Sequence, residues 1–461
     1  MSNPLFNEFS GVSAKQWKQK IQFDLKGADY NETLITRTLE GIDIKPFYHS
    51  EEVDPLAVAI SNTPWKVAQR IEVTDEVTAN KKALNAIKDG VEALDFIINS
   101  PTINLQTLLE NIATEKIQLY FSPQFLSVAF VQQLNEVASA KNSTVFCDQD
   151  FIAQLARTGN WYENLEKDHA KLASISQLSL KNVSVISVDS TLYQNAGANA
   201  VQQLAYALSH ANEYLNFLEK NERLDILQNN PLRFKVAVGN DYFMEIAKLR
   251  ALRILYKTLA EAYHIPTNCY ILAEPSKRNK TIYDYNLNML RTTTECMSSV
   301  LGGADAICNL PYDSLYHPSN EFGDRIAKNQ LLILKHESYF DKVANPADGA
   351  YYIEELTRQL AQKALSLFKQ IEEGGGFLNQ LKEHNIQRKI KENAALEQEL
   401  FDSGKRVLVG TNKYENPQDQ MKDSLEKSPF PEKKSRKTII EPILEKRLAE
   451  NWEQQRLAKE K

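Results

Sequence analysis

The stretch Val183-Ser184-Val185-Ile186-Ser187-Val188 is short and nearly continuous in its apolar character. That pattern is typical of a parallel β-strand covered on both faces, because a strand with one wet face alternates apolar and polar residues. Seven other short segments are similarly rich in β-branched or aromatic residues, and several end at turn formers such as Ser122-Pro123. The predicted strands are residues 66–73, 91–98, 116–121, 143–148, 184–190, 233–239, 268–274 and 305–311.

Helical patterns lie between these strands. Residues 79–89 end at Gly90, a candidate left-handed cap, residues 241–263 are apolar on most faces, and residues 283–301 end at Gly302-Gly303. Eight strand–helix units in series predict the α/β class and a (β/α)₈ TIM barrel. An open doubly wound sheet is the alternative, although no Gly-x-Gly-x-x-Gly turn follows the first strand.

The flanks of the predicted barrel differ from it in character. Residues 1–60 have few periodic apolar patterns and are expected to form an extended N-terminal arm that contacts a partner. The barrel then occupies residues 61–355, and a helical linker segment occupies residues 356–414. Residues 415–461 are expected to be a flexible linker followed by a C-terminal helix over residues 438–461, whose apolar stripe is Ile440, Ile443, Leu444, Leu448 and Trp452.

Composition narrows the class of protein. The 461 residues carry a net charge of -6 at pH 7, which gives no reason to expect nucleic acid or an anionic membrane as a partner. No apolar run reaches the ~18 residues of a membrane span. The first residues lack the pattern of a secretory signal, and the four cysteines are scattered singly, so we expect a cytoplasmic protein with reduced thiols.

Several blocks, in the same order, resemble the adenosylcobalamin-dependent methylmalonyl-CoA mutases. They include Val238-Gly239-Asn240-Asp241-Tyr242, Arg291-Thr292-Thr293-Thr294-Glu295 and Asp348-Gly349-Ala350-Tyr351-Tyr352, and the resemblance runs from about residue 15 to about residue 415. It implies a part in the radical interconversion of succinyl-CoA and (R)-methylmalonyl-CoA.

The chain departs from this family at the positions that carry the chemistry. Tyr270 stands where the resemblance places an arginine, Glu274 where it places a glutamine, and Cys308 where it places a histidine. Tyrosine and thiol are poor substitutes for a guanidinium fork and an imidazole, and Glu274 would turn a negative charge toward an anionic substrate. We therefore expect these three to be degenerate positions of the barrel mouth, with no catalytic residue on this chain.

Cobalt binding is also not expected. The family holds cobalt with the histidine of an Asp-x-His-x-x-Gly motif, and none of the seven histidines has an aspartate two residues before it. The resemblance thus implies the non-catalytic small (β) subunit of a heterodimer, without a cobalamin-binding domain and without a metal or cofactor site of its own. Adenosylcobalamin and the acyl-CoA substrate would be bound by a large (α) subunit.

Two alternatives from other classes stay open. The first is a regulatory or acyl-CoA-binding protein with a surviving pocket near Asp189, Ser190 and Asn309, which lie at predicted strand ends. The second is an independent barrel enzyme that uses Asp189, Glu274 and Cys308 in new roles.

Overall fold

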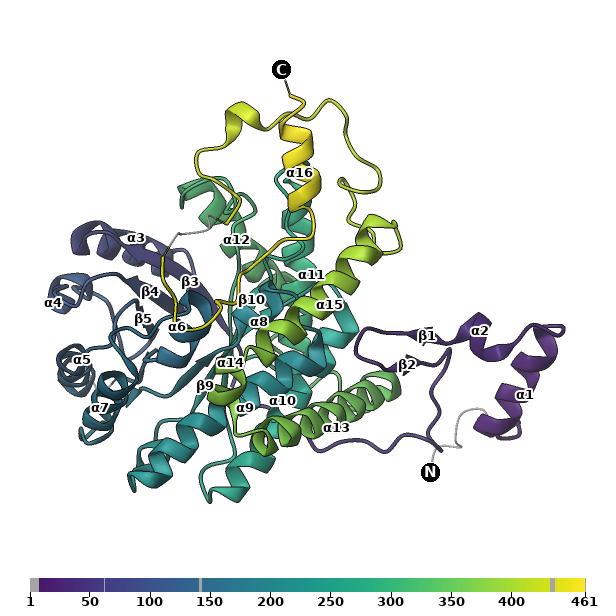
Figure 1. The fold of residues 1–461 in the computed structure, drawn as a ribbon, viewed down its shortest axis with the longest axis horizontal. Coiled ribbons are helices and arrows are strands. Elements are labelled where there is room, and N and C mark those ends of the chain that lie inside the picture. The colour runs from purple at the N-terminus through teal and green to yellow at the C-terminus, as the bar shows by residue number, and fades with distance from the viewer. Residues whose placement is uncertain (1–7, 62, 141–142, 432–435, 461) are drawn as a thin grey trace.

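The barrel is built on one sheet of nine parallel strands (Figure 1). The computed structural model describes residues 8–61, 63–140, 143–431 and 436–460. The strands of the sheet are β3 (Lys66–Val73), β4 (Ala93–Ile98), β5 (Gln118–Pro123), β6 (Val145–Cys147), β7 (Val183–Ser184), β8 (Ser187–Asp189), β9 (Arg233–Val238), β10 (Tyr270–Pro275) and β11 (Ala306–Cys308).

The sheet curls into a barrel through a single segment, residues 183–189. The strand order is β7-β6-β5-β4-β3-β11-β10-β9-β8, so β7 pairs with β6 on one side and β8 pairs with β9 on the other. Between them Val185 and Ile186 are buried, and the Ile186 carbonyl accepts a hydrogen bond from the Arg233 amide. The fifth predicted strand is therefore two short strands, and the prediction of a (β/α)₈ barrel is confirmed.

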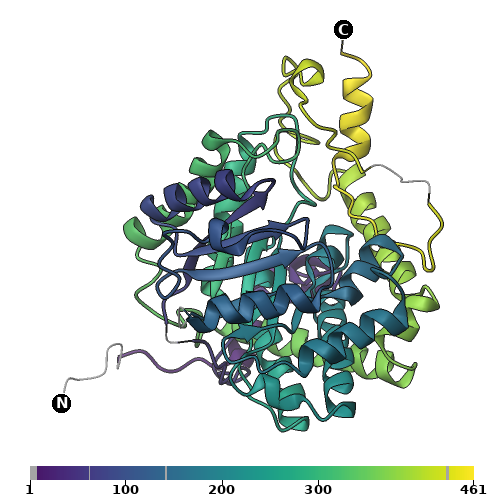
Figure 2. The same ribbon diagram turned by 90° about the vertical axis from the view of Figure 1, so that its left-hand side faces the viewer.

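Helices cover the outside of the strands (Figure 2). They are α3 (Glu76–Lys88), α4 (Leu105–Leu108), α5 (Val128–Ala140), α6 (Phe151–Thr158), α7 (Leu165–Ser176), α8 (Thr191–Asn195), α9 (Ala200–Lys220), α10 (Tyr242–Ala262), α11 (Leu287–Leu301) and α12 (Glu321–Leu332). Gly90 follows α3 with φ +97°, as the predicted left-handed cap requires. The prediction of a helix from residue 283 is wrong by four residues, because Asp284 has φ +44° and its amide binds the Asp419 carboxylate.

Two apolar layers hold the barrel together. The larger one lies between the strands and the surrounding helices. The smaller one fills the inside of the barrel with Ala68, Ala93, Tyr120, Phe146, Leu272, Ala306 and Cys308. Packing of the inner layer leaves only the ends of the barrel for polar chemistry, and in TIM barrels the carboxyl ends of the strands carry it.

The N-terminal arm extends away from the barrel (Figure 1). It contains α1 (Ala14–Asp24), α2 (Tyr30–Leu34) and a small antiparallel pair, β1 (Thr36–Arg37) and β2 (Asp43–Ile44). Ser13 and Gln16 form a reciprocal capping box that starts α1.

The chain after the barrel forms a helical extension and returns over it. The extension is α13 (Tyr351–Glu373), α14 (Phe377–Lys382) and α15 (Asn385–Asp402), and the chain ends in α16 (Glu450–Leu457). Short helical turns occur at Leu224–Leu227, Ile333–Glu337 and Lys422–Ser424. Among the residues described, no helix is both long enough and apolar enough to cross a membrane.

The prediction of a helix over residues 438–461 is largely wrong. Of the described residues in this range, only Glu450–Leu457 is helical, and residues 438–448 form an extended segment, which we call the tail. Ile440, Ile443 and Leu448 are nevertheless buried, because the tail lies against the barrel and each of these side chains packs into it separately. The spacing of these three residues in the sequence matches the period of a helix, although they do not lie on one.

Candidate functional site at the mouth of the barrel

Four charged side chains from four strands meet on the barrel axis. Arg70 of β3 donates to Asp95 of β4 at 3.0 Å and to Glu274 of β10 at 2.5 Å. Lys235 of β9 lies 3.7 Å from the same Asp95 oxygen and 3.8 Å from the same Glu274 oxygen. The two cations and two carboxylates therefore form one neutral cluster, which we call the axial ion cluster.

The cluster keeps its carboxylates ionised. Burial alone raises the pKa of the Asp95 carboxyl, but the charges of Lys235 and Arg70 outweigh burial and hold that pKa well below its ordinary value. The pKa of Glu274 is lowered in the same way, with Arg70 as the larger opposing charge. The negative charge expected at Glu274 is present, and Arg70 and Lys235 balance it.

Tyr270 lies deeper in the barrel than Glu274. It is the first residue of β10, and its hydroxyl forms a 2.6 Å hydrogen bond with that of Tyr120. The guanidinium of Arg233 lies 4.9 Å above the Tyr120 ring and 5.4 Å above the Phe146 ring, and it pairs with Asp148. These large side chains fill the barrel below the axial ion cluster.

Cys308 lies at the end of β11 and lines a cavity of about 200 Å³ together with Glu274, Asn309 and His317. Burial raises the pKa of the Cys308 thiol to about 12. A reactive cysteine needs a lowered pKa, because the thiolate is the nucleophile. Cys308 in this setting is a neutral, poorly reactive thiol.

The other polar residues named from the sequence bond to their own surroundings. Asp189 accepts from the Thr191 amide at 3.1 Å, and Arg157 donates to its carboxylate at 3.1 Å. Ser190 donates to the Lys235 carbonyl, and Asn309 donates to the Ala327 carbonyl. Sequence reasoning missed Arg157, whose only signal was its place on α6, directly after a barrel strand.

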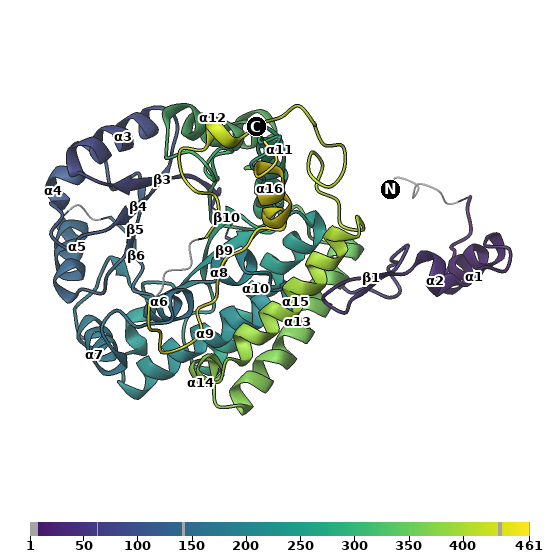
Figure 3. The ribbon, with the colours of Figure 1, turned by 45° about the horizontal axis from the view of Figure 1, so that its top comes forward.

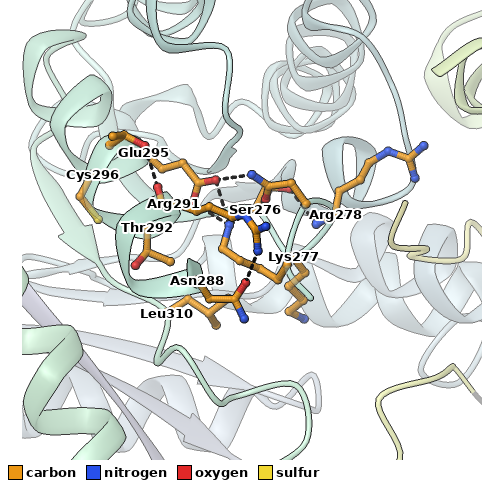
Figure 4. A network of polar contacts seen from close by, with 12 residues as sticks. Ser276, Lys277, Arg278, Asn288, Arg291, Thr292, Glu295, Cys296 and Leu310 are labelled. Carbon is orange, nitrogen blue, oxygen red and sulfur yellow. Dashed lines mark hydrogen bonds and ion pairs between the residues drawn. The ribbon is translucent and has the colours of Figure 1, made fainter. Parts of the chain in front are cut away.

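The segment around Arg291 connects parts of the chain that are distant in sequence through polar contacts (Figure 4). Glu295 pairs with Lys280 at 2.7 Å and accepts from Asn279 at 2.7 Å. Arg291 donates to Asn288 at 2.8 Å and to the Val409 carbonyl at 2.7 Å. Burial raises the pKa of Glu295 and lowers that of Lys280, and the attraction between the two groups opposes both shifts. This family-like block thus ties the loop after β10 to α11 and to the chain near residue 409.

The residues present do not fit a corrinoid held by this chain. The ring nitrogens of His210 are both engaged, with Asp150 at 2.9 Å and Tyr193 at 3.0 Å. His317 borders the mouth cavity with its Nδ1 on Glu426 at 2.8 Å, but about 200 Å³ is below even the ~300–1,000 Å³ of drug-sized ligand pockets. Within the described part of the chain, no group of three or more His, Cys, Asp or Glu side chains is arranged to hold a metal ion.

Comparison with known proteins identifies the family. A sequence model described as "Methylmalonyl-CoA mutase" matches residues 102–459. The chain is 32% identical to the "Methylmalonyl-CoA mutase small subunit" of Porphyromonas gingivalis, over 99% of this chain and 78% of that protein. It is 28% identical to the protein of the same name in Streptomyces virginiae, over 88% of this chain and 71% of that one.

A related protein called only "Methylmalonyl-CoA mutase", from Cereibacter sphaeroides, is 27% identical over 86% of this chain and 64% of its own length. The family match covers most of the barrel, the helical extension and the tail, and the similarity to the first relative covers nearly the whole chain. This chain therefore belongs to the methylmalonyl-CoA mutase family.

Proposed function

We propose that this chain is the non-catalytic small subunit of a heterodimeric, adenosylcobalamin-dependent methylmalonyl-CoA mutase in the cytoplasm. The large subunit would bind adenosylcobalamin and the acyl-CoA, and it would interconvert succinyl-CoA and (R)-methylmalonyl-CoA. The cofactor, when bound there, supplies the radical chemistry. This chain contributes a stable barrel and surfaces that hold the partner.

The axial ion cluster is the observation that carries this proposal. An active site presents donors that are free to meet a substrate, whereas Arg70, Lys235 and Glu274 already satisfy one another at 2.5–3.8 Å. Cys308 has a raised pKa, which also argues against an independent enzyme that uses it as a nucleophile.

The partner role is supported by the shape of the chain and by its relatives. The arm stands away from the barrel, and its exposed apolar side chains include Phe23, 77% exposed, and Trp17. Two similar proteins bear the words "small subunit" in their names. We propose that the arm, within residues 1–60, contacts the large subunit, and that residues 61–355, 356–414 and 415–461 act as the barrel, its helical support and its covering segment.

Reconstitution tests this proposal. The chain and the large subunit are expressed separately and together, and mutase turnover is measured with added adenosylcobalamin and succinyl-CoA. We expect no turnover from this chain alone and full turnover from the complex. Turnover by the isolated chain at a rate comparable with the complex would contradict the assignment.

A second candidate function is acyl-CoA binding without catalysis. A cavity of about 570 Å³ lies among the β1–β2 pair, α15 and the loops after β9 and β10, and its size suits a small organic ligand. Calorimetric titration of the isolated chain with succinyl-CoA distinguishes the two functions, because the small-subunit proposal expects no saturable heat.

A further inference from the structure

The tail runs across the carboxyl ends of the barrel strands (Figure 3). Near α6 the amide of Ile440 donates to the Gly159 carbonyl, and that of Ile443 donates to the Ala156 carbonyl. Farther on, the amide of Lys446 donates to Asn195 at the end of α8, and that of Leu448 donates to Arg278 after β10. The tail is therefore anchored at both sides of the mouth, and residues 444 and 445 lie between the anchors.

Glu445 uses this position to bridge two cations of the mouth. One of its carboxylate oxygens accepts from Arg157 Nη1 at 2.8 Å, and the other accepts from Lys277 Nζ at 3.1 Å. Arg157 belongs to α6 and Lys277 follows β10, so the two donors are brought together by the fold and not by sequence. Both cations keep some access to solvent, with 37% and 42% of their side chains exposed.

Arg157 and Lys277 are arranged as a site that binds a carboxylate, and the Glu445 carboxylate occupies it. Each oxygen has its own charged donor, which is the geometry that makes charge-assisted pairs strong. Asp189 lies beside the same guanidinium at 3.1 Å and would repel a second negative charge on a ligand. A monoanionic carboxylate therefore suits the position better than a phosphate dianion does.

We propose that Arg157 and Lys277 form a carboxylate-binding site at the barrel mouth, which Glu445 of the tail fills and which an external carboxylate occupies when Glu445 is absent. The site uses other side chains than the four of the axial ion cluster, and it does not depend on the small-subunit proposal. In the intact chain, the tail therefore competes with anionic ligands for this site at the mouth.

The test is chemical rescue of Glu445→Ala in the full chain. Sodium acetate is the probe, sodium phosphate at matched ionic strength is the counter-probe, and both thermal unfolding and calorimetric titration are followed. Glu441→Ala is the matched control, because Glu441 lies on the same tail but pairs with the exposed Lys391. We expect Glu445→Ala to unfold at a lower temperature than wild type and acetate to restore part of the loss.

Acetate should bind Glu445→Ala at least about tenfold more tightly than it binds wild type or Glu441→Ala, a difference of about 1.4 kcal/mol. Adding Arg157→Met to Glu445→Ala should abolish the acetate response. An equal response of wild type, a folded Glu445→Ala that ignores acetate, or a phosphate response as large as that to acetate would each overturn the proposal.

Glu445→Ser, which removes the carboxylate and leaves room at the position, provides a second variant should the alanine variant not fold. It should show the same order of acetate over phosphate. Loss of folding in both variants would also overturn the proposal, because it would make Glu445 a structural group and not an exchangeable ligand.

Discussion

Arg70 is the residue on which the axial ion cluster depends. It lies between two carboxylates from different strands, and its side chain is 32% exposed while Asp95 is fully buried. Removing charges from water is costly, so a buried pair is stable only where geometry and further hydrogen bonds compensate. Ser122 supplies such a bond to Asp95 at 2.8 Å. The cluster therefore fails if one member loses its charge.

The substitution Glu274→Gln tests this dependence. It leaves Arg70 and Lys235 with one carboxylate between them, so we expect the free energy of unfolding to fall by about 2–4 kcal/mol, somewhat below the ~3–5 kcal/mol of a fully buried pair because Arg70 is partly exposed. Urea unfolding measures the loss. Glu72→Gln, an exposed residue of β3 that lines the same cavity, is the control and should change stability by less than about 0.5 kcal/mol.

Thiol reactivity provides a second prediction at this scale. All four cysteines are buried, and burial raises the pKa of both Cys269 and Cys308 to about 12. An aromatic disulfide reagent at pH 8 should therefore label none of them in the native chain and all four in guanidinium chloride. Rapid labelling of native Cys308 would show that the mouth opens in solution or that this thiol is activated.

Acid stability depends on Asp189. Burial alone raises the pKa of its carboxyl, but Arg157 and Lys235 reverse that effect and lower the pKa to about 2. The unfolded value is about 3.9, so the folded pKa is depressed. The stabilisation by Asp189 is thus complete above about pH 4 and is lost as the pH falls toward 2.

Comparison of wild type with Asp189→Asn by urea unfolding from pH 6 to pH 2 isolates this contribution. The stability difference between them should shrink by about 2 kcal/mol as the pH falls through that range. A difference that stays constant with pH would mean that the charge of Asp189 does not stabilise the folded state.

At the scale of elements, local patterns predicted the barrel well. Each predicted strand overlaps an observed one, since β-branched runs bounded by turns reflect burial on both faces. The break between β7 and β8 was not predictable, because it arises from pairing with β6 and β9, which are remote in sequence. The tail was predicted wrongly because its burial also depends on a contact with a remote segment. Ile440 and Ile443 pack separately against α6, and their spacing happens to equal that of a helix.

The close approach of the tail to α6 depends on Gly159. Its φ is +76°, and a Cβ there would lie 2.6 Å from the Ile440 carbonyl oxygen. Gly159→Ala should therefore cost the strain of a left-handed alanine, about 1–2 kcal/mol, plus the displacement of the tail. Gly404→Ala is the matched control, because Gly404 has φ +72° with open space around its Cβ position.

We expect Gly159→Ala to destabilise the chain by at least about 1 kcal/mol more than Gly404→Ala in urea unfolding. The tail should also become accessible to trypsin at Lys446 in Gly159→Ala alone. Equal stability loss and equal cleavage of the two variants would show that the contact between Gly159 and the tail contributes nothing beyond backbone strain.

The candidate site could be predicted from the sequence only in part. Glu274 and Cys308 were recognised as mouth residues, and both line the same cavity. Their partners could not be recognised, because Arg70 is 204 positions from Glu274, and Glu445 is 288 positions from Arg157. Pairing across a closed barrel is set by strand order and register, which a single sequence does not encode in any local pattern.

At the scale of the whole molecule, the two ends of the chain behave in opposite ways. The tail folds back over the mouth, whereas the arm leaves the barrel and carries α1 into solvent (Figure 1). A helix of 11 residues is marginal by itself in water, so a packing surface would stabilise α1. Trp17 stacks on Phe47 at 4.4 Å, but Phe23 on the same helix is 77% exposed. Exposed aromatic side chains of this kind mark protein interfaces.

The substitution Phe23→Ser therefore tests the arm as a partner contact. If α1 packs on the large subunit, loss of this ring should weaken the heterodimer by about 1–3 kcal/mol, or roughly fivefold to 150-fold in Kd, while the stability of the isolated chain stays the same. Leu396→Ser, which removes an exposed apolar side chain from α15, is the control for a general surface effect. Sedimentation or calorimetry with the purified large subunit gives both affinities. Equal affinities of wild type and Phe23→Ser would place the partner surface elsewhere on the molecule, and a selective loss in Leu396→Ser would move it to the helical extension.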